Sequence, residues 1–235
     1  MGIRHPRGHI TTLLFVGVLQ RFSRRSGATD AEFHGSLPGD DVLPRPMIEW
    51  TRATTFEAPA EDVWPWLVQM GYGRGGWYTS ERFDRIIWRI RNVSADRILD
   101  EWQHLAVGDI VPDGPGYAAY FRVAEVVPGR SIVYRSIRHP YRGHPVDPGD
   151  EDALRGLEQR LVDGGVYLDF SWAFALRPID QRRTRLVVRT RAAAHPAWLR
   201  LLAVPLGLVD FYHVSTMFSG LRRRVSGRLR ARPSD

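Results

Sequence analysis

The sequence predicts an α+β domain in which an antiparallel sheet curves around a long C-terminal helix. Hairpin-length connections join strands in the middle of the chain, so neighbouring strands run antiparallel. The last third instead has a sustained apolar repeat at helical spacing, at Phe211, Val214, Phe218, Leu221 and Val225. Helices and strands are therefore segregated, which is typical of the α+β class and not of an alternating α/β fold.

A strand and two helices open the predicted domain. Residues 50–57 alternate and are rich in threonine and aromatic side chains, as expected for a strand. Pro59 suits the first turn of the helix that follows. The apolar stripe of this helix is Val63, Trp66, Leu67 and Met70. Ser80 is a suitable N-cap for a second helix over residues 80–91.

Gly71, Gly73 and Gly76 form a literal G-x-G-x-x-G between these two helices. A dinucleotide-binding motif follows a strand and opens a helix, whereas these glycines follow a helix. We interpret them as the exit from that helix, where glycine adopts left-handed backbone angles at little cost. No nucleotide cofactor is expected.

Four further strands are predicted, at residues 117–127, 131–138, 165–176 and 184–192. In the last of these, Arg185, Arg189 and Arg191 alternate with apolar residues and fall on the outer face of the sheet. We expect that face to be solvated. Asp169 also points outward, and we expect it to pair across the strands with Arg189 or Arg191.

The sequence divides into a domain and two flanking parts. Residues 1–35 are predicted to be an N-terminal tail or a short apolar helix outside the domain, and polar residues 20–47 to be a linker into it. Residues 36–228 form the domain, with an inserted loop at 139–164 that contains a short helix. Residues 229–235 are a basic tail.

Composition limits the classes of partner. The 235-residue chain has a net charge of +7 and no cysteine, which excludes disulfides and thiolate metal sites and fits a cytoplasmic protein. Its arginines gather in three clusters, but no nucleic-acid-binding motif presents them. We therefore expect no nucleic-acid partner. His139 and His144 match no zinc spacing, so no metal is expected either.

Two apolar stretches are too short or too interrupted to span a membrane. Residues 10–19 fall well below the ~20 residues that a spanning helix needs, and basic residues flank them. They suit a short packed helix or an interfacial anchor. Residues 198–218 are interrupted by Pro205 and Asp210, and suit a buried or partly interfacial helix.

Several sequence motifs resemble those of one protein family. They are Phe-Glu-Ala-Pro-Ala-Glu-Asp-Val-Trp-Pro-Trp-Leu-Val-Gln-Met-Gly at 56–71, Arg-Gly-Gly-Trp-Tyr at 74–78, Gly-Asp at 108–109 and Val-Val-Pro-Gly-Arg at 126–130. With the final amphipathic helix, they resemble the START-like superfamily of polyketide cyclases/dehydrases and lipid-transfer domains, in its bacterial SRPBCC branch. The resemblance covers roughly residues 36–227.

This resemblance implies the helix-grip fold: a sheet of about six or seven strands around the C-terminal helix, with two short helices after the first strand. It also implies a cavity between sheet and helix for a hydrophobic small molecule. A filled core made of the same residues is the alternative. The expected lining residues are Trp66, Met70, Arg74, Tyr78, Phe121, Val123, Tyr134, Phe170, Trp172, Phe174, Val188, Phe211 and Phe218.

A few polar side chains are candidates for chemistry. Arg74 lies in the glycine segment and could hold a carboxylate or an enolate, and Tyr78 and Tyr134 could donate hydrogen bonds to a ligand. His213 lies one helical turn from Asp210 and could serve as a carboxylate-oriented general base, with a surface ion pair as the alternative. Arg74 and His213 are therefore the two catalytic candidates.

Three functions follow as expectations. The first is a cytoplasmic binder of a lipid, polyketide or aromatic molecule. The second is a cyclase/dehydratase without metal or nucleotide cofactor. The third is a peripheral membrane lipid-transfer protein that uses residues 10–19 and the basic C-terminus as membrane contacts. The sequence does not predict the oligomeric state.

Overall fold

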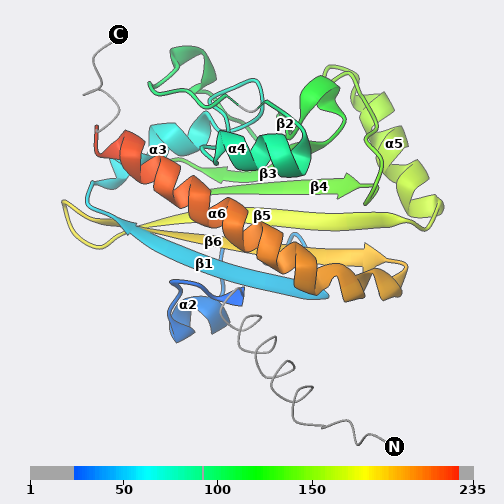
Figure 1. Cartoon of the computed structure of the whole chain (residues 1–235), viewed down its shortest axis with the longest axis horizontal. Helices are drawn as coiled ribbons and strands as arrows, with labels where there is room; N and C mark the ends of the chain where they lie inside the picture. The colour runs from blue at the N-terminus through cyan, green and yellow to red at the C-terminus, as the bar shows by residue number, and fades with distance from the viewer. Residues whose placement is uncertain (1–23, 92, 228–235) are drawn as a thin grey trace, which may run out of the picture.

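The computed structural model describes residues 24–91 and 93–227 (Figure 1). Its strands are β1 (Ile48–Phe56), β2 (Ile110–Pro112), β3 (Tyr120–Val127), β4 (Ser131–Arg138), β5 (Tyr167–Pro178) and β6 (Thr184–His195). Its α-helices are α2 (Asp30–His34), α3 (Ala60–Val68), α4 (Glu81–Phe83), α5 (Glu151–Asp163) and α6 (Ala203–Val225). The predicted residues 10–19 and the tail at 229–235 lie outside the described residues.

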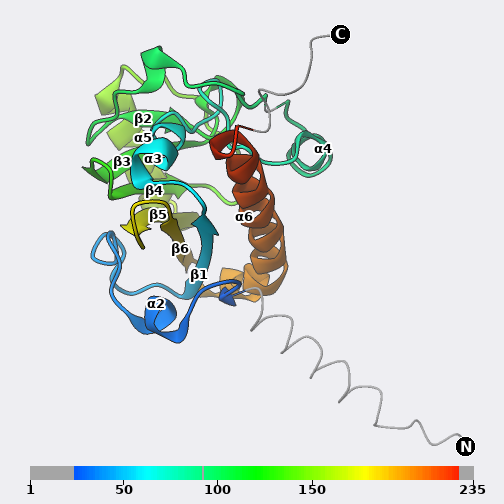
Figure 2. The same cartoon turned by 90° about the vertical axis from the view of Figure 1, so that its left-hand side faces the viewer.

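The strands form one antiparallel sheet in the order β1-β6-β5-β4-β3-β2. The helix α6 runs along one face of this sheet, and α2 lies on the other side of β1 (Figure 2). The α6 stripe predicted from the sequence packs inward, with Val214, Phe218 and Leu221 buried. The α+β class, the six-stranded sheet and the long C-terminal helix are thereby confirmed.

One local prediction was wrong, and one strand was missed. The second helix does not extend over residues 80–91, because α4 passes after Phe83 into a π-helical turn, Asp84–Trp88. The strand β2 was not predicted, since three residues are too few to show an alternating pattern.

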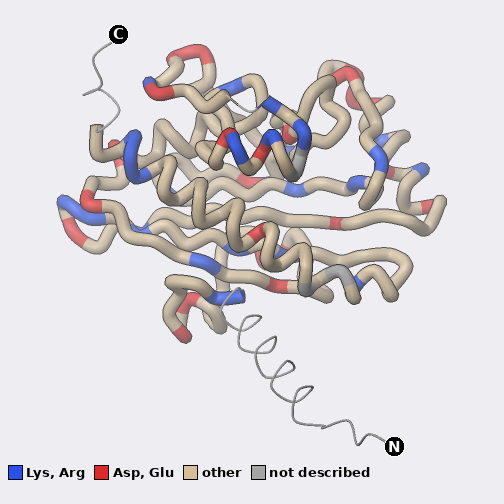
Figure 3. Tube along the Cα trace, viewed as in Figure 1, with Lys and Arg blue, Asp and Glu red and all other residues tan. Residues whose placement is uncertain are grey.

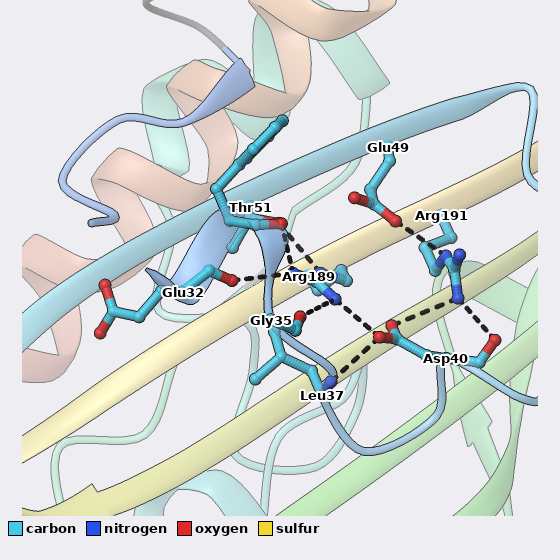
Figure 4. A network of polar contacts seen from close by, with 9 residues as sticks. Glu32, Gly35, Leu37, Asp40, Glu49, Thr51, Arg189 and Arg191 are labelled. Atoms are coloured by element: carbon cyan, nitrogen blue, oxygen red, sulfur yellow. Dashed lines mark hydrogen bonds and ion pairs between the residues drawn. The ribbon is translucent and has the colours of Figure 1, made fainter. Parts of the chain in front are cut away.

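The outer face of the sheet is covered, which corrects the prediction of a solvated arginine face. The side chain of Arg189 is 3% exposed. Its guanidinium donates to Thr51 Oγ1, to the carbonyl oxygens of Glu32 and Gly35, and to Asp40 Oδ2 at 2.7 Å (Figure 4). All five donors of an arginine suit such a set of planar acceptors.

The segment that covers this face is the supposed linker. Thr29 and Glu32 form a capping box that starts α2, and Glu32 also binds Arg185 through two contacts of 2.7 Å. The chain from residue 24 to 47 therefore packs on the sheet, and the linker prediction was wrong for this part. Its polar groups accept hydrogen bonds from the arginines of β6. These contacts join residues far apart in the sequence, so no local pattern predicts them.

Two further contacts complete the outer face. Asp169 pairs with Arg135 of the neighbouring strand β4, with two hydrogen bonds of 3.0 and 2.8 Å, because Arg189 and Arg191 are engaged by Asp40. The predicted pairing of Asp169 with an arginine of β6 was therefore wrong.

In the inserted segment, α5 packs Leu154, Leu157 and Leu161 against Tyr120 of β3.

Candidate functional site

The glycine segment forms a tight turn at the end of α3. Gly71 and Gly76 exchange two backbone hydrogen bonds, of 3.3 and 3.0 Å. Gly71, Gly73 and Gly76 all have positive φ, as predicted for a helix exit. The backbone N–H of Tyr72 donates to the carbonyl of Pro112 at 2.9 Å, which fixes the turn to β2.

Gln69 joins this turn to the connecting region before β2. Its amide donates to the Arg97 carbonyl and accepts from the backbone N–H of Leu99, at 3.2 and 2.9 Å. Gln103 also donates to Gln69 Oε1. This fully buried glutamine therefore holds the short 3-10 helix Asp100–Trp102 beside the glycine turn.

Arg74 leaves the turn toward this connection. Its guanidinium lies 4.7 Å from the ring centroid of Trp102 and donates through Nη2 to the Val68 carbonyl at 3.0 Å. Its Nε is buried without a hydrogen-bond partner, and no carboxylate among the described residues forms an ion pair with it. Burial lowers the pKa of Arg74 from its ordinary value.

Arg74 lines a pocket of about 230 Å³ beside β2. Most of its walls are aromatic, aliphatic or glycine backbone. The lining residues are Tyr72, Gly73, Arg74, Trp102, Ile110, Pro112, Gly114, Gly116 and Tyr117. A single planar cation in an apolar pocket is suited to a ligand with one anionic group.

Two predicted phenols lie in the main core. Tyr78 donates its hydroxyl to the Trp66 carbonyl at 2.9 Å, so its hydrogen bond is made within the protein. The hydroxyl of Tyr134 is buried and has no partner among the described residues. Burial raises the pKa of Tyr134, which keeps it a neutral hydrogen-bond donor.

The other predicted lining residues lie away from this pocket, and their role in ligand binding stays a prediction. Phe211 lies beside Arg52, and Phe170 packs against the edge of the core. The rest pack together in the main core, namely Trp66, Met70, Tyr78, Phe121, Val123, Tyr134, Trp172, Phe174, Val188 and Phe218.

The proposed pair of Asp210 with His213 does not form. Asp210 instead makes an ion pair with Arg52 of β1, whose side chain is 2% exposed. The ring of His213 lies 5.9 Å from that of Trp172 and 6.5 Å from that of Phe83. Arg52 shares the inward face of its strand with Trp50 and Phe56, and a charge at such a position was the signal that sequence reasoning missed.

Most of the pocket escaped prediction because it comes from residues 92–116, a connection without a predicted element. Trp102 carries no periodic pattern there, and Tyr117, predicted to begin a strand, ends a 3-10 helix with a positive φ of 54°. Such backbone angles in a non-glycine residue often mark functional segments. Among residues 24–91 and 93–227, no group of three or more histidine or acidic side chains is placed to hold a metal.

The described part of the chain has no helix with the length and apolarity to cross a membrane. No protein-family profile matches the chain. No curated protein matches it either.

Several solved structures are similar in fold. One is a conserved protein of Geobacillus kaustophilus, with 13% identity and a TM-score of 0.42, over 76% of this chain and 95% of the other. Another is a protein of Mesorhizobium loti, with 14% identity and a TM-score of 0.42, over 79% and 100%. A third, from Thermobifida fusca, has 18% identity and a TM-score of 0.41, over 79% and 97%. With identities and TM-scores this low, these likenesses support no argument about the function of the chain or the details of its fold.

Proposed function

We propose that the chain binds a small, largely apolar molecule that carries a carboxylate, and that Arg74 holds this carboxylate. The observation that supports the proposal is the guanidinium of Arg74, which lines the pocket and has no carboxylate partner among the described residues. The sequence also indicated Arg74 and a carboxylate. It placed the cavity between the sheet and the C-terminal helix, whereas the pocket lies beside β2.

The physical reason is desolvation. A partly buried cation loses hydration and regains free energy when an anion binds it, and a guanidinium can bind both oxygens of a carboxylate. The Trp102 ring and the Val68 carbonyl hold the guanidinium in place for this contact. Apolar walls suit the remainder of the ligand, and a volume of about 230 Å³ suits one or two rings or a short chain.

This proposal retains the resemblance to the START-like superfamily and its SRPBCC branch, in which a helix-grip domain encloses a hydrophobic ligand. The sheet, the C-terminal helix and the two short helices after β1 support that assignment. A cytoplasmic location remains part of the proposal.

Binding is better supported than cyclase/dehydratase activity. A cyclisation of that type needs a group that accepts a proton beside the substrate. Tyr134 lies in the main core, and burial raises the pKa of its phenol, which makes it a donor instead of a base. His213, the other candidate, lies against Trp172 and not in the pocket.

Calorimetric titration with matched ligands tests the proposal. Aromatic and medium-chain carboxylates are compared with the uncharged primary amides of the same carbon skeletons. We expect carboxylates to bind about 10- to 100-fold more tightly than amides, because a hydrogen-bonded charge contributes about 1.5–3 kcal/mol. Arg74→Met should abolish this difference, since it keeps an unbranched apolar stem and removes the cation.

The matched control is Arg142→Met, which changes an exposed arginine in the inserted segment and should leave the difference intact. Equal affinity of carboxylates and amides for the unmodified chain would contradict the proposal. A preference that survives in Arg74→Met would also contradict it, because the anion would then be held elsewhere.

A further inference from the structure

Large apolar side chains are exposed at the start of α6. Leu201, in the 3-10 helix Ala197–Leu202, is 73% exposed, and Leu208 and Tyr212 on α6 are 36% and 46% exposed. Pro205, Leu208 and Tyr212 follow a spacing of three and four residues, so these exposed residues share one side of α6, and Leu201 lies just before its first turn. We call Leu201, Pro205, Leu208 and Tyr212 the α6 stripe.

The α6 stripe takes no part in the core. The opposite side of the helix already packs on the sheet, where Gly207 lies against Trp50 and Val214 and Met217 are fully buried. Farther along α6, the outward positions change to Ser219 and Arg223, both exposed, while Arg222 donates to Thr54 Oγ1 of β1. The apolar exposure is therefore confined to the first half of the helix.

Charges flank the α6 stripe and are nearly absent within it. Between Leu201 and Leu221 the only charged residue is Asp210, which is paired with Arg52 (Figure 3). Arg200 is exposed immediately before the stripe, and Arg223 is exposed after it. The cations thus border an apolar centre.

A neighbouring segment extends the same surface. The ring of Phe83 lies 4.6 Å from that of Tyr212, which places the turn after α4 beside the α6 stripe. In that turn Ile86 is 63% exposed and Arg85 is exposed, and in α4 itself Glu81 and Arg82 are exposed.

We propose that the α6 stripe docks the domain onto an anionic lipid bilayer. Exposed leucine and tyrosine side chains enter the interfacial region, and the flanking arginines bind lipid phosphates. Trp198, 57% exposed beside Leu201, suits the same depth, since tryptophan and tyrosine favour the membrane interface. The charge pattern favours a lipid surface over a second copy of this basic chain, whose arginines would repel these ones.

This docking is independent of ligand binding at Arg74. The helix α6 contacts β1, whereas the Arg74 pocket lies beside β2, at the opposite edge of the sheet. Membrane docking is therefore expected to persist when ligand binding is lost, and ligand binding to persist when docking is lost. The two proposals are tested by separate experiments.

Vesicle flotation of the full chain tests the proposal. Phosphatidylcholine vesicles are compared with vesicles that also contain phosphatidylglycerol, at low and high salt. We expect binding to the anionic vesicles that weakens with salt. The double variant Leu201→Ser/Leu208→Ser should bind at least about tenfold more weakly, because each buried leucine contributes strongly to partitioning.

The matched control is Val107→Ser/Ile179→Ser, which changes two exposed apolar residues elsewhere on the fold. Circular dichroism establishes that both double variants are folded. Unchanged vesicle binding of Leu201→Ser/Leu208→Ser would overturn the proposal and place the contact elsewhere, for example at residues 10–19. Equal binding to both vesicle types would overturn the requirement for anionic lipid. Self-association through the α6 stripe without vesicle binding would make a second copy the occupant and would also overturn the proposal.

Discussion

Three inward or buried arginines differ in the groups that neutralise their charge. Arg52 pairs with Asp210, and Arg189 pairs with Asp40. Arg74 has an aromatic ring and a carbonyl oxygen as partners, and none of the described carboxylates pairs with it. An arginine without a counterion at a pocket is the one suited to binding an anion.

Glu32 carries a prediction about pH. The two hydrogen bonds from Arg185 lower the pKa of Glu32 from 4.5 to about 2. A carboxylate with a depressed pKa stabilises the fold above the unfolded-state pKa, and this stabilisation is lost as the pH falls from about 4.5 toward 2. Glu32→Gln should therefore lower the free energy of unfolding by about 1.5–3 kcal/mol at pH 7, and by less at pH 3, as measured by urea denaturation.

Glutamine can still accept the Thr29 N–H bond of the capping box, so this variant isolates the charge. Asp30→Asn in the same helix is the control, because the Asp30 side chain is 79% exposed and should contribute within about 0.5 kcal/mol. A pH-independent difference between Glu32→Gln and the unmodified chain would contradict the assigned role.

At this scale the sequence indicated Arg74 but not its surroundings. The glycines beside it pointed to a turn that exposes a side chain. Trp102, which stacks on the guanidinium, is brought there through the Gln69 amide. A contact of this kind depends on tertiary hydrogen bonds and leaves no local pattern.

At the scale of elements, α6 approaches the glycine segment closely. A Cβ added at Gly220 would lie 1.9 Å from the carbonyl oxygen of Tyr78, which is backbone and cannot move aside easily. Gly220→Ala should therefore lower the free energy of unfolding by about 1–3 kcal/mol, even though alanine favours a helix. Thermal and urea unfolding measure this loss.

Gly114→Ala is the comparison for this variant, since a Cβ there meets no atom within 4 Å. It should be nearly neutral. An increase in stability for Gly220→Ala would show that α6 does not lie this close to Tyr78.

Elements with a long period were predictable, and irregular ones were not. The stripe of α6 and the alternation of β5 and β6 emerge from the sequence because each spans many residues. The π-helical turn at Asp84–Trp88 has residues that also suit an α-helix. Its irregular hydrogen bonding could therefore not be predicted from the sequence. The short strand β2, which forms part of the pocket, has too few residues for a pattern.

At the scale of the whole molecule, both faces of the sheet are covered. The helix α6 and α3 pack on one face, and the segment at 24–47 and α5 pack on the other. The capping box at Thr29 and Glu32 was the signal in the sequence that this segment is ordered. Its docking on β6 could not be predicted, because it depends on arginines about 150 residues away.

Arg189→Lys tests how this segment is held. A lysine cannot reproduce the several planar contacts of the guanidinium, so residues 24–47 should open more often. We expect chymotrypsin to cleave at Phe33 about tenfold faster in this variant, by electrophoresis and mass spectrometry. The control is Arg177→Lys, at an exposed position of β5, which should leave the cleavage rate unchanged. Equal rates for the two variants would mean that Arg189 does not hold the segment.

A crystal structure of the chain with 4-bromobenzoate tests the central claim most directly, because the bromine locates the ligand by its anomalous signal. We predict carboxylate oxygens about 2.7–3.1 Å from the Arg74 guanidinium, with the ring among the apolar walls beside β2. A ligand bound between α6 and the sheet, away from Arg74, would contradict the claim.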